Sequence, residues 1–125
     1  MLSDHQAIAT IAVKNLPTAA RFYEDVLGLR AVSKEGDDLI VYQCGNSMLN
    51  VYRSAHAGSN QATSVAWAVG EGIDAEVRAL KEKGVTFEHY EMAGMKLVGD
   101  VHEGGDMKVA WFKDPDGNIL NLVGR

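Results

Sequence analysis

The sequence predicts an α+β fold made of two tandem βαβββ modules, in which a curved, barrel-like mixed sheet encloses a cleft and the helices lie outside. An internal duplication carries this prediction. Residues 12–28 and residues 68–84 have the same pattern, in which the end of a strand is followed by a helix that stops at glycine. Residues 45–51, a Gly-Asn turn leading into a Leu-Asn pair, recur as residues 117–122. Each half is too small to bury its own sheet, so the halves are expected to pack together.

The 125 residues have room for one compact domain, residues 1–125. The repeat divides it into a first module at 7–53 and a second at 64–124, joined by a small, polar linker at 54–63. The second module is the longer one, and its extra residues are placed in an inserted loop at 92–106. This segment is rich in glycine and has no sustained period. Loops of such length in compact domains are commonly functional, for example as lids.

Composition excludes several classes of protein. An apolar fraction of 46% with 23% charged residues is typical of a globular domain. No apolar run reaches the roughly 18 residues of a membrane span, and the first residues do not resemble a signal peptide. Cys44 is the single cysteine, which predicts a reducing, cytoplasmic environment. A net charge of -5 disfavours nucleic acid and membrane surfaces as partners.

In the first module, residues 8–14 alternate like a strand. Asn15 is a plausible N-cap, Pro17 suits a first helical turn, and Gly28 suits the end of the helix. Three further strands are predicted at residues 31–34, 39–44 and 48–52.

In the second module, residues 64–69 are the first predicted strand. Ile73, Val77 and Leu80 form the apolar stripe of a helix that Gly84 stops. Further strands are predicted at residues 85–90, 107–113 and 119–123.

Strand alternation predicts which side chains face the cleft. If Ile11 and Val13 pack under the first helix, then Ile8, Thr10 and Ala12 point the other way. By the repeat, the helix side of the second module holds Val65, Trp67 and Val69, and the cleft side holds Ser64, Ala66 and Ala68.

On the last strand of each module the aliphatic side is set by Leu49 with Val51 and by Leu120 with Leu122, so that Asn50 and Asn121 face inward. The two amides either bind a polar group of a ligand or satisfy each other or buried backbone. The remaining residues expected to contact a ligand are Ser64, Thr10, Met48, Tyr52, Trp111 and His102, although alternation does not fix the facing of Trp111, Tyr42 or Tyr90.

Over residues 7–124 the chain resembles the vicinal oxygen chelate superfamily, with the glyoxalase and bleomycin-resistance fold. The resemblance rests on Asn15-Leu16, on Arg21-Phe22-Tyr23 and Val26-Leu27-Gly28-Leu29, and on Phe112-Lys113-Asp114-Pro115-Asp116-Gly117-Asn118. In that terminal motif, proline fixes the entry to a turn and glycine supplies the positive φ.

Enzymes of this superfamily hold a divalent metal through a His on the first strand and a Glu on the last strand of each module. Carried over, these positions are Ile8, Asn50, Ser64 and Asn121. None is an imidazole or a carboxylate, and amides and neutral hydroxyls are poor ligands for zinc or iron. The sequence therefore predicts no metal and no cofactor.

His102 and Glu103 are candidates for a general acid and base if the inserted loop folds over the cleft. The alternative is that His102 is a solvated loop histidine.

Superfamily members without a metal resemble drug-sequestering proteins. The resemblance thus implies a metal-independent protein that binds a small organic molecule, aromatic or cationic. One alternative is an enzyme (a lyase, isomerase, dioxygenase or thiol transferase) with a displaced metal, or a metal-free catalyst using His102 and Glu103. Another is a non-binding module whose cleft is filled by methionines. The resemblance also implies a homodimer, and leaves domain swapping open.

Overall fold

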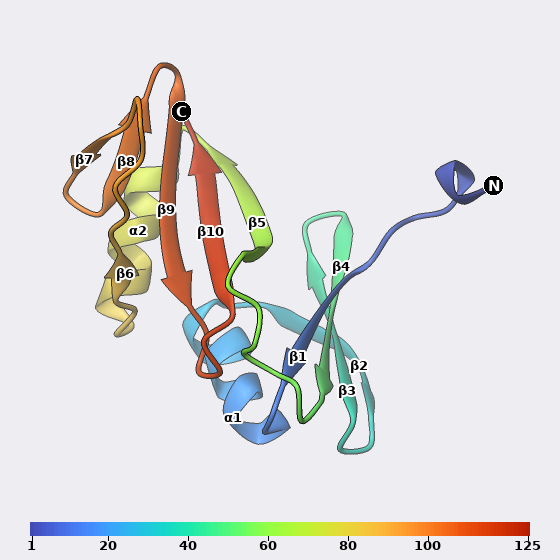
Figure 1. Cartoon of the computed structure of the whole chain (residues 1–125). Helices are drawn as coiled ribbons and strands as arrows, with labels where there is room; N and C mark the ends of the chain where they lie inside the picture. Colours follow the sequence, from blue (N-terminus) through green and yellow to red (C-terminus); the bar gives the residue numbers. More distant parts are fainter. The chain divides into compact units, whose positions relative to one another are not determined.

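The computed structural model describes all residues from Met1 to Arg125 and resolves them into two compact units, Met1–Ser59 and Asn60–Arg125. The boundary falls within the predicted linker at 54–63. The α+β class is confirmed, since each unit contains one mixed sheet and its own helix (Figure 1). None of the helices has the length and apolar character that a membrane span requires.

The first unit follows the predicted βαβββ order. Its sheet has the strand order β1-β4-β3-β2, in which β1 and β4 are parallel and the other pairs antiparallel. Its elements are η1 (Leu2–Asp4), β1 (Ala9–Val13), α1 (Leu16–Ala20), η2 (Arg21–Val26), β2 (Arg30–Glu35), β3 (Leu39–Cys44) and β4 (Ser47–Arg53).

The first helix begins and ends where predicted, but its second half is a π-helix rather than an α-helix. Asn15 Oδ1 accepts a hydrogen bond from the Thr18 N–H at 2.9 Å, which caps the helix. From Arg21 onward it is a π-helix, in which the Leu27 N–H donates to the carbonyl of Phe22. Gly28, at φ 75°, ends it.

The core of the first unit lies between this helix and one face of the sheet. Ile11, Val13, Leu49 and Val51 are buried as alternation predicts. Tyr42 is also fully buried, and its hydroxyl donates to Glu24 at 2.9 Å. Burial, with the hydrogen bond to Glu24 and the negative charge of Glu24, raises the pKa of Tyr42 well above its ordinary value. Tyr42 is thus a core residue.

The second unit repeats the pattern with an addition at one edge. Its sheet has the order β5-β10-β9-β8-β7, with β5 and β10 parallel, and β6 also pairs with β9. Its elements are β5 (Thr63–Gly70), α2 (Ile73–Glu82), β6 (Phe87–Glu88), β7 (Lys96–Val98), β8 (Val101–Gly104), β9 (Met107–Lys113) and β10 (Ile119–Gly124).

The prediction of an irregular inserted loop at 92–106 is wrong. This segment contains the β7–β8 hairpin, and β8 continues the ladder on the edge of β9. Because β6 pairs with one half of β9 and β8 with the other, two short strands replace the single strand predicted at 85–90. The two-residue turn between β7 and β8 starts at Gly99, whose φ of 62° suits a tight hairpin.

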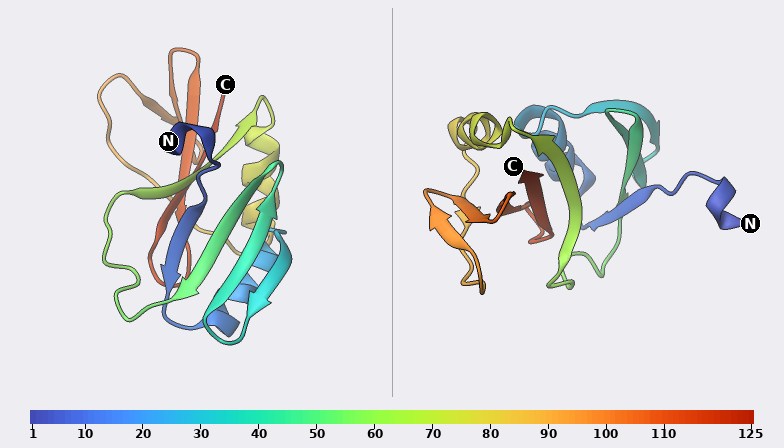
Figure 2. Two further views of the ribbon diagram at one scale, coloured as in Figure 1. Left: turned by 90° about the vertical axis from the view of Figure 1, so that its right-hand side faces the viewer. Right: turned by 90° about the horizontal axis from the view of Figure 1, so that it is seen from above.

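Each helix covers one face of its own sheet (Figure 2). Helix α1 packs on β4, whereas α2 packs on β5, β9 and β10. In the second unit, Trp67 stacks on Phe112 with ring centroids 6.4 Å apart, on the helix side as predicted. The face of each sheet opposite its helix is called here the open face.

The Asp-Pro-Asp-Gly-Asn turn joins β9 to β10 and is held by Asp114. Its Oδ1 accepts the backbone N–H groups of Asp116 and Asn118 at 2.9 Å each. Its Oδ2 accepts the side-chain N–H of Asn118 at 2.8 Å, and Gly117 has a φ of 87°. This motif therefore fixes the start of β10, the strand that carries Asn121.

Candidate functional site

Four predicted contact residues lie together on the open face of the first unit. Thr10 on β1 and Asn50 on β4 are register partners. Met48, Asn50 and Tyr52 alternate along β4, opposite the buried Leu49 and Val51, so they share one face. Asn50 is half-buried and Tyr52 is 39% exposed.

Asn121 lies on the open face of the second unit, at the centre of its sheet. Its register partners are Trp111 on β9 and Ala66 on β5, with Ser64 two residues before Ala66. Asn121 is only 9% exposed, and its Oδ1 has no hydrogen-bond partner. The structure thus places Asn121 and Trp111 on one face and leaves a buried acceptor unsatisfied there, while Ser64 lies at an irregularity in the β5–β10 register and has no partner in it.

Beside Asn121 is a pocket with a volume of about 290 Å³, named here the Trp111 pocket. The rings of Trp111 and Tyr90 meet nearly at right angles, at 77°, with centroids 5.3 Å apart. The Trp111 indole N–H donates to Thr63 Oγ1 at 3.2 Å, which fixes the ring. The lining residues are Gln61, Ala62, Thr63, Tyr90, Met92, Trp111 and Ile119.

The lining of the Trp111 pocket is mostly outside the predicted site. Trp111 was predicted as a contact, and Tyr90 was an aromatic residue of open facing. Residues 61–63 and Met92 were missed, because they lie in a polar linker and at a turn where no periodicity reports on facing. The only feature of the sequence that could have indicated these residues is that aromatic residues, Tyr90 and Trp111, occur later in the same module.

His102 is not a solvated loop residue, as one prediction had it, because it lies on β8 and is 1% exposed. Its Nε2 accepts the backbone N–H of Tyr90 at 2.9 Å, and its Nδ1 contacts the carbonyl of Val109 at 3.3 Å. Its ring also lies 4.9 Å from that of Trp111. With both nitrogens engaged, His102 supports the two aromatic residues of the pocket.

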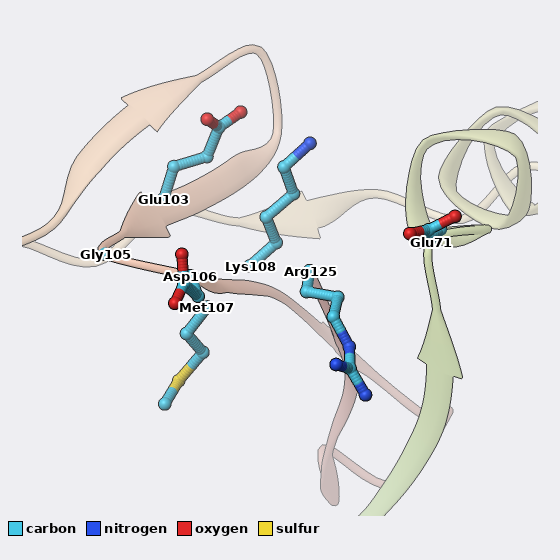
Figure 3. Close-up of a pocket in the computed structure, with 7 residues that line it drawn as sticks. All are labelled: Glu71, Glu103, Gly105, Asp106, Met107, Lys108 and Arg125. Carbon is cyan, nitrogen blue, oxygen red and sulfur yellow. The ribbon is translucent and has the colours of Figure 1, made fainter.

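His102 and Glu103 are not brought together as an acid–base pair. They are consecutive on β8, and consecutive strand residues point to opposite faces. Glu103 instead lines a different hollow, with a volume of about 370 Å³, at the end of the sheet near the β8–β9 turn (Figure 3). That hollow is lined by Glu71, Glu103, Gly105, Asp106, Met107, Lys108 and Arg125.

This second hollow is suited to water and ions rather than to an apolar molecule. Its lining holds three acidic and two basic side chains, and Met107 is its one large apolar side chain. Lys108 is in addition 3.7 Å from Asp74. Sites for small organic molecules are instead mostly apolar, with few polar groups. The Trp111 pocket matches that description better.

The residues at the carried-over metal positions do not fit a catalytic metal. Ile8 precedes β1 and has no donor atom in its side chain, while Asn50, Ser64 and Asn121 offer neutral oxygens. Zinc and iron sites are built from imidazoles, thiolates and carboxylates. No group of three or more His, Cys, Asp or Glu side chains is placed to bind an ion. Elsewhere, His89 bonds to Asp100 at 2.8 Å, but Lys81 occupies the same carboxylate at 2.6 Å.

Comparison with known proteins assigns the family. Residues 4–122 match the model of the Glyoxalase/Bleomycin resistance protein/Dioxygenase superfamily, and the chain belongs to this superfamily. A search of curated proteins gives no match.

Solved structures with the same fold include three of different description. A lactoylglutathione lyase from Agrobacterium tumefaciens is 17% identical, with a TM-score of 0.72, and the match covers 96% of this chain and 92% of that one. The antibiotic binding protein TnmS3 from Streptomyces sp. CB03234 is 19% identical, with a TM-score of 0.67 and coverage of 96% and 94%. The fosfomycin resistance protein FosX from Listeria monocytogenes is 13% identical, with a TM-score of 0.72 and coverage of 97% and 93%. At these identities the likeness establishes the fold.

Proposed function

We propose that this protein binds a small aromatic organic molecule in the Trp111 pocket without using a metal. The observation that carries the proposal is the pocket itself, with Trp111 and Tyr90 exposed to it and no Asp, Glu, His, Lys or Arg among its lining residues. Aromatic side chains bind flat apolar ligands through their large contact area. The volume of about 290 Å³ suits a compact ligand of two fused rings.

The fixed geometry of the pocket supports this proposal. Thr63 holds the indole of Trp111 through the hydrogen bond at 3.2 Å, and His102 holds the backbone of Tyr90 through the bond at 2.9 Å. A preorganised wall loses little conformational entropy when a ligand binds. Neither bond requires a ligand to be present.

The descriptions of two structural neighbours are in line with this proposal. TnmS3 is described as an antibiotic binding protein and FosX as a fosfomycin resistance protein. We extend the first description to this chain as sequestration of an organic compound. The donor chemistry at Ile8, Asn50, Ser64 and Asn121 supports binding without a metal, since it lacks the ligands that a family metal requires.

Two further parts of the proposal concern the first unit and the assembly. Thr10, Met48, Asn50 and Tyr52 share the open face of the first unit, and we propose that they are ligand contacts too. We also propose that the protein is a homodimer. Catalysis by His102 is not proposed, because both of its ring nitrogens are engaged with backbone groups.

Isothermal titration with indole, quinoline and 2-naphthol, in excess EDTA, tests the proposal. At least one probe is expected to bind at one equivalent per site, and Trp111→Ala is expected to weaken it about tenfold or more, since the main contact surface is lost. Trp67→Phe is the matched control, because Trp67 stacks on Phe112 on the helix side. Binding that persists in Trp111→Ala, or that EDTA abolishes, contradicts the proposal.

A further inference from the structure

The unsatisfied amide of Asn121 indicates what the ligand must offer. Asn121 Oδ1 is the one buried side-chain nitrogen or oxygen in the chain that has no hydrogen-bond partner. A buried acceptor without a partner destabilises the folded state, so such atoms are rare in folded proteins. An acceptor at this place is readily explained if a ligand donates to it.

The position of Asn121 connects it to the Trp111 pocket. Asn121 is directly across the antiparallel ladder from Trp111 and two residues along β10 from Ile119. Both of these residues line the pocket. Residues paired across a ladder, and residues two apart on a strand, project from the same face. Asn121 does not itself line the ligand-free pocket, so its amide has to turn toward a ligand lying on Trp111 to accept a hydrogen bond from it.

The buried polar groups next to the pocket already have partners, whereas Gln61 and Tyr90, which also line it, are exposed to water. The Trp111 N–H is bonded to Thr63, and the His102 nitrogens are bonded to backbone groups of Tyr90 and Val109. What this face lacks is a donor for Asn121. The ligand is thus expected to carry an N–H or O–H group rather than a second acceptor.

The charges around the pocket favour a neutral ligand. None of its lining residues carries a charge at neutral pH. Two charged residues lie across the ladder from the pocket residues: Lys113 is opposite Ile119, and Glu88 is opposite Trp111. Their side chains form an ion pair at 3.3 Å, so their charges neutralise each other. A charged ligand would lose its hydration without gaining a counter-ion.

We infer that the Trp111 pocket selects uncharged aromatic molecules whose N–H or O–H group donates to Asn121 Oδ1, such as phenols, lactams and indoles. This inference rests on the proposed function and narrows its class of ligand. Organic anions and aromatic ethers of the same size are the molecules that the site discriminates against. This selectivity follows from one acceptor in a neutral aromatic pocket, and needs no metal.

Three probes of one ring system test the inference by isothermal titration at neutral pH. In 2-naphthol the hydroxyl can donate, in 2-methoxynaphthalene it cannot, and 2-naphthoate is an anion. The wild-type protein is expected to bind 2-naphthol about tenfold or more tightly than either of the others, because only 2-naphthol can donate a hydrogen bond to the buried acceptor.

Asn121→Leu tests whether the amide causes the preference, because leucine keeps the shape and removes the acceptor. The ratio of 2-naphthol to 2-methoxynaphthalene affinity is expected to fall to about one, and Asn121→Ala replaces this variant if it does not fold. Asn46→Leu, the same change in the exposed turn between β3 and β4, is expected to keep the wild-type ratio.

The outcomes separate the inference from the proposed function. If 2-naphthol and 2-methoxynaphthalene bind the wild type equally, if 2-naphthoate binds best, or if the preference survives in Asn121→Leu, the inference is wrong while Trp111-dependent binding stands. If none of the three probes binds, both the inference and the proposed function are wrong.

Discussion

His102 shows how a single residue can be misjudged from sequence. It lies among glycines and charged residues, a context that favours a solvated loop. In the structure it is buried, because the N–H of Tyr90 and the carbonyl of Val109 satisfy both ring nitrogens. A buried polar side chain is tolerated when its hydrogen bonds are made. That pairing depends on backbone groups of other strands, which a sequence pattern does not display.

His102→Leu is expected to lower the free energy of unfolding by about 1–3 kcal/mol, because the Tyr90 N–H loses its acceptor. Urea denaturation measures the loss, and the Tyr90 amide is expected to exchange its hydrogen faster. His56→Leu is the control, since the His56 side chain is exposed, and it is expected to change stability by no more than about 0.5 kcal/mol. An unchanged Tyr90 exchange rate would contradict the structural role of His102.

Asp100 provides a pH-dependent term in the stability. The hydrogen bond from Lys81, followed by that from His89, lowers the pKa of Asp100 below its ordinary value of 3.8. Because the folded-state pKa is the lower one, this stabilisation is present above the ordinary value and is lost as pH falls through the lowered folded-state value. It therefore contributes at neutral pH and disappears in acid.

Asp100→Asn is accordingly expected to lower the Tm at neutral pH, and the difference from wild type is expected to shrink as pH falls below 3.8. Thermal unfolding by circular dichroism across this range measures it. Asp37→Asn, in the exposed turn between β2 and β3, is expected to show no such pH-dependent difference. If the difference in Tm between Asp100→Asn and wild type stays constant with pH, the ion pairs of Asp100 are not its cause.

At the scale of elements, long alternating segments were predictable and short ones were not. The strands at 39–44 and 107–113 match β3 and β9 residue for residue. The β7–β8 hairpin was missed because strands of three and four residues give too few positions for alternation to register. The π-helix at Arg21–Val26 was missed for a related reason, since its apolar stripe resembles that of an α-helix.

The hairpin depends on a close approach at Gly104. A Cβ at this position would lie 2.7 Å from the carbonyl oxygen of Gly94 and 3.1 Å from Cγ of Met95. Gly104→Ala is therefore expected to displace the hairpin and to cost about 1–3 kcal/mol. Hydrogen exchange is expected to rise in β7 and β8.

Gly36→Ala is the matched control for that variant. A Cβ at Gly36 meets nothing within 4 Å, although its φ of 54° adds some strain. Exchange in β7 and β8 is expected to stay at the wild-type level in this variant. If Gly104→Ala leaves the exchange of the hairpin unchanged, the packing of Gly94 on Gly104 is not what holds it.

At the scale of the whole molecule, the duplication predicted the fold class and most of the order of strands and helices along the chain. The same argument placed Asn50 and Asn121 correctly on the faces away from the buried aliphatic residues. It did not reveal the Trp111 pocket, because this pocket combines the end of the linker, a turn residue, Trp111 of β9 and Tyr90, which lies beyond the end of β6. Which segments meet there depends on how the insertion is folded, and the first module has no counterpart to it.

The proposed homodimer is tested by size-exclusion chromatography with light scattering. The expected mass is twice that of the 13.5 kDa chain, over a range of loading concentrations. A mass of one chain at every concentration would contradict the proposal and leave the Trp111 pocket unaffected, because its lining comes from one unit of one chain.

The parallel pairing of the outer strands has a consequence for biosynthesis. In the first unit, β1 finds its neighbour β4 once residue 53 has left the ribosome, but β5 must wait for β10, which forms at residues 119–124 and lies between β5 and β9. A nascent chain can thus complete the first sheet early, whereas the second sheet lacks the strand between β5 and β9 until β10 has been translated. A chaperone that shields exposed strand edges would find its substrate in that interval, in the half that carries both tryptophans.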